Sequence, residues 1–214
     1  MSLSKTMTAI WGPMGWMTLH SVATSYPEAP TETEKQLMSS WVEMFRDTIT
    51  CPYCKQHFGE MLENYRRQFP GYLNSRHEFA MFSFRAHNAV NRRLKKPIYA
   101  TILDCMQTLQ NNIKTRSARD YRISYVNHIT RYWRTFNDIS GITAMRKIQE
   151  MKKIEEEYIS RVDTKFAVSF RNDVVVLPAD MLEKHVEPQT RSPVRFTGPA
   201  PLLKLGRGGF QIRR

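Results

Sequence analysis

Apolar residues in the first half of the chain recur with the three-to-four-residue spacing of amphipathic helices. Helices are predicted over residues 10–25, 31–48, 51–68, 75–94 and 101–111. Thr31 and Glu34 have the spacing of a capping box, and prolines separate several of the predicted helices. No alternating strand pattern occurs in this half. Four antiparallel helices with short connections, closed by a short fifth, predict an all-α bundle.

The second half is also mainly helical by pattern. Helices are predicted over 119–138 and 142–160, and a small β-hairpin over 166–170 and 174–177. From residue 188 onward proline, glycine and arginine dominate, which is typical of a disordered segment. The predicted organisation is a bundle at 1–112, a mainly helical extension of unknown role at 113–187 and a basic, disordered tail at 188–214.

Positive charge is concentrated in the second half. The chain of 214 residues has a net charge of +12, of which +3 belongs to residues 1–112 and +9 to residues 113–214. This excess favours an acidic surface, a nucleic acid or an anionic membrane as partner of the second half, although a solvated basic face with no partner fits equally. No apolar run reaches the length of a membrane span, and the first residues lack a secretory signal pattern.

Two of the three cysteines form the motif Cys51-Pro52-Tyr53-Cys54, which opens a predicted helix. Such a pair is typical of redox chemistry, of half a zinc site, or of an incidental spacing. Zinc would need two further ligands, and only His57 and Cys105 are at hand, without a second pair at finger-like spacing. The redox reading is therefore favoured. At a helix start the dipole and free N–H groups stabilise a thiolate.

A polar stripe marks the fourth predicted helix. His87, Val90, Asn91 and Leu94 follow one another at i, i+3, i+4 and i+7 and so share one face. An imidazole and amides beside apolar positions need hydrogen-bond partners if they are buried. A planar, polar ligand would supply them, whereas the plainer alternative is a helix surface with a satisfied core histidine.

Taken together, these motifs resemble the Erv/ALR family of FAD-linked sulfhydryl oxidases. The resemblance is carried, in order, by Trp11-Gly12-Pro13-x-x-Trp16-x-x-x-His20, Tyr26-Pro27, Cys51-x-x-Cys54-x-x-His57-Phe58 and His87-Asn88-x-Val90-Asn91-x-x-Leu94-x-Lys96-Pro97. It covers about residues 8–105. It implies a helical bundle that holds FAD, with the Cys51–Cys54 disulfide beside the isoalloxazine.

The resemblance also implies the residues of the site. The family's FAD contacts correspond to Gly12, Trp16, His20, Tyr26, His87, Asn88, Val90, Asn91, Leu94 and Lys96, with no metal ligand. Family members are commonly homodimers through the first two helices. Trp41 and Met44 would serve such an interface or, alternatively, the core.

The implied reaction turns two protein thiols into one disulfide. A substrate thiolate attacks the disulfide at Cys51, expected to be the more exposed sulfur, and a second substrate thiol resolves the mixed disulfide. Cys54 then passes electrons to the flavin, and oxygen accepts them to give hydrogen peroxide. The substrate is a thiol-containing protein or a small dithiol carrier.

The chain departs from the family pattern at two points. Phe84 stands where many members have a structural cysteine, which leaves Cys105 single, either as a buried apolar-like residue or as a thiol for an intermolecular bond. No shuttle cysteine pair occurs. This minimal set resembles the large-DNA-virus branch, which would place the enzyme in the host cytoplasm or the virion. The competing hypothesis is a basic helical module for nucleic acid or virion assembly, which would have no reason to bind flavin.

Overall fold

The computed structural model describes residues 3–136, 138–162, 164 and 166, and these form helices and no strand. The α-helices are α1 (Leu3–Ser25), α2 (Glu32–Asp47), α3 (Pro52–Gln68), α4 (Arg76–Arg93), α5 (Ile102–Ile113), α6 (Ala118–Tyr132) and α7 (Gly141–Glu157). Two 3-10 turns, η1 (Trp133–Thr135) and η2 (Ile159–Arg161), follow α6 and α7. The predicted all-α fold is confirmed. The predicted hairpin, apart from Phe166, and the predicted tail lie outside the described residues.

Side-chain caps explain where most helices begin. The predicted capping box is present: the Thr31 side chain accepts from the Glu34 N–H, and the Glu34 carboxylate accepts from the Thr31 N–H. Thr101 and Asp104 repeat the arrangement at α5, while Ser75 caps α4. These caps satisfy N–H groups that have no partner inside the helix.

The helix predicted over 119–138 is shorter in the structure. α6 ends at Tyr132, and the chain continues through η1 into a turn before α7. Trp133 folds back over Gly141, where a Cβ atom would come within 2.8 Å of the indole ring. The apolar pattern continues past Tyr132 because Phe136 is buried in the turn, not because the helix continues.

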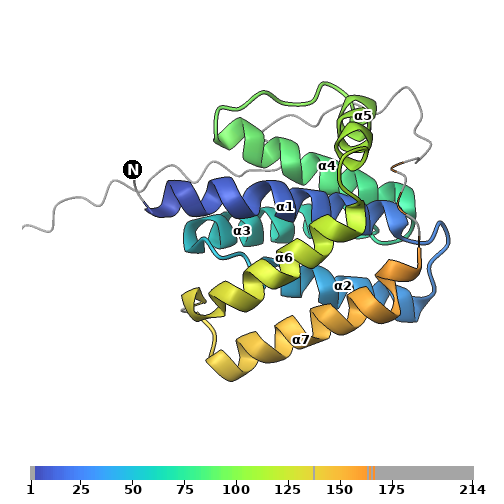
Figure 1. The fold of residues 1–214 in the computed structure, drawn as a ribbon. Coiled ribbons are helices and arrows are strands. Elements are labelled where there is room, and N and C mark those ends of the chain that lie inside the picture. The colour runs from blue at the N-terminus through green and yellow to red at the C-terminus, as the bar shows by residue number, and fades with distance from the viewer. Residues whose placement is uncertain (1–2, 137, 163, 165, 167–214) are drawn as a thin grey trace, which may run out of the picture. The chain divides into compact units, whose positions relative to one another are not determined.

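α1 lies between α4 on one side and α6 on the other, and α7 runs along α6 and α2 (Figure 1). The main hydrophobic cluster combines side chains of α1–α4 with side chains of α6 and α7, including Tyr125, Ile129, Met151 and Ile154. The helices that follow the bundle therefore share its core. Trp41 and Met44, suggested for a dimer interface or the core, are 2% and 7% exposed in this cluster.

A buried ion pair joins α6 to α7. The Arg122 Nε donates to the Glu155 Oε2 at 2.8 Å, and their side chains are 3% and 10% exposed. Arg122 also lies 3.5 Å from the Thr164 hydroxyl, which contacts Ser25 at the end of α1. The pair thus connects both helices to the end of α1.

No helix among the described residues is long and apolar enough to cross a membrane.

Candidate active site

The two motif cysteines form a disulfide at the start of α3. Cys51 is the N-cap of the helix, and its sulfur accepts a hydrogen bond from the Cys54 N–H at 3.3 Å. Pro52 occupies the first helical position, where a missing N–H costs nothing. The sulfurs thus lie at the positive end of the helix dipole, which favours the thiolate form after reduction.

The exposure of the two cysteines is opposite to the prediction. Cys51 is 5% exposed, whereas Cys54 is partly exposed. The expectation that Cys51 is the more exposed sulfur is therefore wrong for this structure. The physical reason is the position of Cys51 before the helix, where it packs into the main cluster. Cys54 only lies against the edge of that cluster.

The disulfide lines a cavity of about 910 Å³ between α1, the start of α3, α4, α5 and α6. This volume is in the range of ligand and cofactor sites. Seven of the ten predicted FAD contacts line the same cavity: Gly12, Trp16, His87, Val90, Asn91, Leu94 and Lys96. These contacts from α1, from α4 and from the segment after α4 are therefore brought to one cavity with the disulfide at the start of α3, although their motifs lie far apart in the sequence.

The other three predicted contacts, His20, Tyr26 and Asn88, do not line the cavity. Tyr26 directly follows the end of α1, ten residues and about 15 Å of helix rise beyond Trp16. Its hydroxyl donates to the Leu73 carbonyl at 3.1 Å. The Asn88 amide donates to the Tyr99 carbonyl at 2.9 Å and accepts from the Tyr99 N–H at 3.0 Å. Asn88 therefore acts on the cavity through Tyr99, which does line it.

His20 reaches the cavity through a chain of hydrogen bonds. The Ser83 hydroxyl donates to the Ala80 carbonyl at 2.8 Å, so it must accept from the His20 Nδ1–H at 2.9 Å. Burial, followed by the charge of His87, lowers the pKa of His20 well below its usual value, so the ring is neutral. Its Nε2 then accepts from the His87 Nδ1–H at 3.0 Å. Burial, followed by the charge of Lys96, lowers the pKa of His87 to about 4, which leaves its Nε2 unprotonated.

Two polar groups in the cavity wall point to a bound ligand. Within the described part of the chain, Trp11 Nε1 and Arg93 Nη1 are buried without a hydrogen-bond partner, and both residues line the cavity. Buried donors in native proteins are normally paired. Trp16 and His87 stack with ring centres 4.2 Å apart, and the Arg93 guanidinium lies over the Tyr53 ring. Flat aromatic surfaces with free donors and cations suit a planar, anionic cofactor such as FAD.

The motifs did not single out several lining residues as contacts. Three of these residues lie inside or next to the motifs of the family: Trp11, Tyr53 and Arg93. Their aromatic or basic side chains at those positions could have indicated a contact with the ligand. Tyr121 comes from α6, and no sequence signal connected that helix to the site.

Cys105 lies in a second hydrophobic cluster and is fully buried. Phe84 belongs to the same cluster. Burial raises the pKa of the Cys105 thiol to about 12, so it is protonated at neutral pH. Of the two readings, the structure agrees with the buried, apolar-like residue.

Comparison with known proteins identifies the family. A model of the Erv1/Alr family matches residues 13–114. The putative FAD-linked sulfhydryl oxidase 347L of Invertebrate iridescent virus 6 is 36% identical over 92 residues, which cover 42% of this chain and 83% of that protein. This chain belongs to the Erv1/Alr family. The membership predicted from the motifs is confirmed.

Other Erv1/Alr relatives are both viral and cellular. The FAD-linked sulfhydryl oxidase of African swine fever virus (isolate Pig/Kenya/KEN-50/1950) is 35% identical over 89 residues, 41% of this chain and 71% of that protein. The mitochondrial FAD-linked sulfhydryl oxidase ERV1 of Saccharomyces cerevisiae is 37% identical over 86 residues, 40% of this chain and 43% of that protein. No solved structure matches the chain. The family match ends at residue 114, so α6 and α7 lie beyond it.

Proposed function

We propose that this Erv1/Alr protein is an FAD-linked sulfhydryl oxidase that converts pairs of protein thiols into disulfides, with oxygen as the acceptor and hydrogen peroxide as the product. The observation that carries the proposal is the Cys51–Cys54 disulfide in the wall of a cavity with stacked aromatic rings. The competing basic binding module gives no reason for a disulfide at that position.

The lining of the cavity fits FAD. Trp16 and His87 offer a stacked aromatic surface for a flat ring, and Arg93 and Lys96 offer positive charge for phosphates. Trp11 Nε1 and Arg93 Nη1 offer the unpaired donors. The remaining proposed lining contacts are Gly12, Val90, Asn91 and Leu94. FAD held by these residues would supply the two-electron acceptor for the reduced cysteine pair and the group that reduces oxygen.

The residues of this chain perform the thiol exchange. A substrate thiolate attacks one sulfur of the Cys51–Cys54 bond, and the other sulfur leaves as a thiolate. A second substrate thiolate then breaks the mixed disulfide, so the substrate is oxidised and both cysteines are reduced. The start of α3 lowers the cost of each thiolate because its N–H groups and dipole face the sulfurs. That Cys51 receives the substrate and Cys54 faces the flavin stays a prediction.

Partners and setting remain predictions of the same proposal. The substrate is a thiol-containing protein or a small dithiol carrier, and the setting is the host cytoplasm or the virion if the chain is viral, as several relatives are. An acidic or nucleic-acid partner is proposed for the basic second half. A homodimer would use a surface other than Trp41 and Met44, because both side chains are buried.

The decisive experiment is a visible absorption spectrum of the purified protein, before and after a dithiol is added in air. Flavin bands that bleach as oxygen is consumed and return on re-aeration are expected. A colourless protein that also fails to take up added FAD would reject the oxidase and favour the basic binding module.

A further inference from the structure

The residue before the cysteine pair is held by α6. Thr50 directly precedes Cys51, and its hydroxyl lies 3.2 Å from the His128 Nε2. Both side chains are buried, at 5% and 7% exposed. Two residues earlier, the Thr48 hydroxyl lies 3.3 Å from the Tyr125 hydroxyl. The segment that leads into the disulfide is therefore held by side-chain hydrogen bonds to one face of α6.

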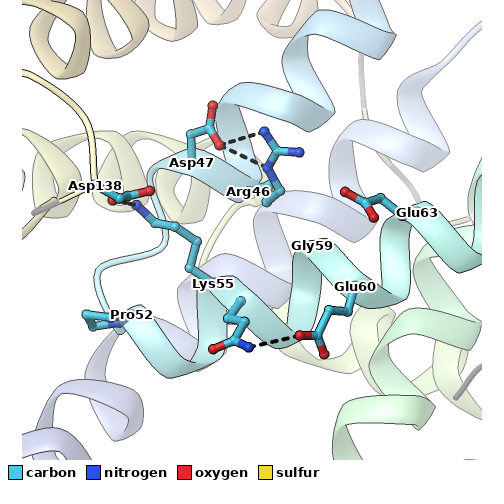
Figure 2. A pocket seen from close by; sticks show the side chains of 9 residues that line it. Arg46, Asp47, Pro52, Lys55, Gly59, Glu60, Glu63 and Asp138 are labelled. Carbon is cyan, nitrogen blue, oxygen red and sulfur yellow. Dashed lines mark hydrogen bonds and ion pairs between the residues drawn. The ribbon is translucent and has the colours of Figure 1, made fainter. Parts of the chain in front are cut away.

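The residue after the cysteine pair is held by the turn between η1 and α7. Lys55 directly follows Cys54, and its Nζ donates to the Asp138 Oδ1 at 2.7 Å. The same ammonium lies 5.0 Å from the centre of the Phe136 ring. Figure 2 shows Lys55 reaching across from α3 to Asp138, beside Pro52, in a groove of about 460 Å³. The disulfide is thus bracketed on both sides by side chains from residues 125–138.

These contacts give a role to a part of the chain that the family match does not reach. The match ends at residue 114, whereas every group that brackets the disulfide lies beyond it. A stable fold alone would not require contacts to both residues that flank the motif. Such contacts act directly on the two segments that must adjust when the S–S bond opens and closes.

We propose that residues 125–138 are a positioning element for the Cys51–Cys54 disulfide, with His128 and Asp138 as its two positioning residues. The element favours the disulfide over the dithiol in two ways. The bond between His128 and Thr50 restrains the segment before Cys51, which limits the freedom that the dithiol gains. The ion pair between the Asp138 carboxylate and the Lys55 ammonium restrains the segment after Cys54 in the same way. The proposal rests on the Cys51–Cys54 pair being the redox-active pair of the proposed oxidase.

The test measures the equilibrium in which the disulfide and two glutathione thiols give the dithiol and one glutathione disulfide. The full chain as purified is equilibrated without oxygen in glutathione buffers of known ratio, free thiols are trapped by alkylation and counted by mass, and the redox state of any bound flavin is followed by its visible absorption. The variants are Asp138→Asn, which keeps the shape but removes the charge, and Thr50→Val, which removes the hydroxyl that His128 contacts. Because Asp138 is 57% exposed, its variant will fold.

Matched controls come from the same helices. Thr130→Val removes a hydroxyl that donates within α6, to the Val126 carbonyl at 2.7 Å. Glu157→Gln removes an exposed charge at the end of α7. Neither change removes the contacts that hold Thr50 and Lys55, so neither variant should move the equilibrium.

We expect the equilibrium constant for reduction of the disulfide to be at least threefold larger in each test variant than in the wild type. This corresponds to a reduction potential about 14 mV higher for a two-electron couple. Test variants that match the wild type, or controls that shift as much as the test variants, would overturn the proposal. The readout needs no turnover, so a protein without oxidase activity would reject the proposed function while this equilibrium stayed measurable.

Discussion

The buried pair Arg122–Glu155 allows a sharp test of how α6 and α7 are joined. Substituting Glu155→Gln keeps the shape but leaves a guanidinium that cannot lose its proton in a site where it is 3% exposed. Apart from Glu155, its hydrogen-bond partner in the described part of the chain is the Thr164 hydroxyl at 3.5 Å, a contact too weak to replace a carboxylate. Breaking one side of a buried pair costs about 3–5 kcal/mol.

This cost corresponds to a fall in melting temperature of about 6–20 °C for a chain of this size. The double variant Arg122→Met, Glu155→Leu removes both charges. Its free energy of unfolding is expected to lie within about 1 kcal/mol of that of the wild type, or above it. One reason is that the Glu155 Oε1 is buried without a partner among the described residues, so the pair is imperfectly satisfied already.

The assay is urea denaturation followed by circular dichroism, at one fixed concentration of FAD for all three proteins. A Glu155→Gln variant that loses less than about 1 kcal/mol would refute the reasoning. Such a result would mean that the Arg122 guanidinium reaches water and that α6 and α7 are not packed as described.

Three further predictions concern the cysteines and a histidine. Cys54→Ser should keep FAD but abolish oxygen consumption with a dithiol, and normal turnover measured with an oxygen electrode would contradict the mechanism. Cys105→Ala should turn over near the wild-type rate and lose about 1 kcal/mol of stability, because the thiol is buried and protonated; a large loss of rate would mean that Cys105 relays electrons. The pKa of His87 is about 4 in the folded protein against 6.5 in the unfolded chain. Its contribution to the free energy of unfolding is therefore present above pH 6.5 and is lost as the pH falls towards 4. Between about pH 7.5 and 5 the FAD-free wild type should lose about 2 kcal/mol more unfolding free energy than His87→Gln in urea titrations, and equal losses would contradict the neutral, buried ring.

The helices and most of the cavity could be predicted from the sequence because their signals are local. The capping box at Thr31 and Glu34 and the apolar spacing of the first half predicted the helices close to where the structure has them, except that α1 begins at Leu3 and not at residue 10. The spacing of His87, Val90 and Asn91 predicted that they share one face, and all three line the cavity. The periodic pattern was enough to group them because one helix supplies all three, whereas the ligand was implied only by the family resemblance.

Features that depend on contacts between distant residues could not be predicted in this way. The exposure of Cys51 and Cys54 depends on how the start of α3 packs against the core. The spacing of residues in the sequence carries no information on that packing. The contact between Thr50 and His128 joins residues 78 positions apart. Tyr26 belongs to a motif of the family, yet its hydroxyl bonds to the Leu73 carbonyl, away from the cavity. A motif gives the order of residues but not the direction in which each side chain points.

The cluster that contains Phe84 and Cys105 has a consequence for how the protein is made. The only disulfide that the three cysteines form is the one in the active site. Apolar packing, not a covalent bridge, joins α4 and α5 at this point. The packing of α4 against α5 at this point therefore needs no oxidation of Cys105 and can form while every thiol of the chain is reduced. If the proposed function is right, this enzyme needs no earlier disulfide to bring these two helices together.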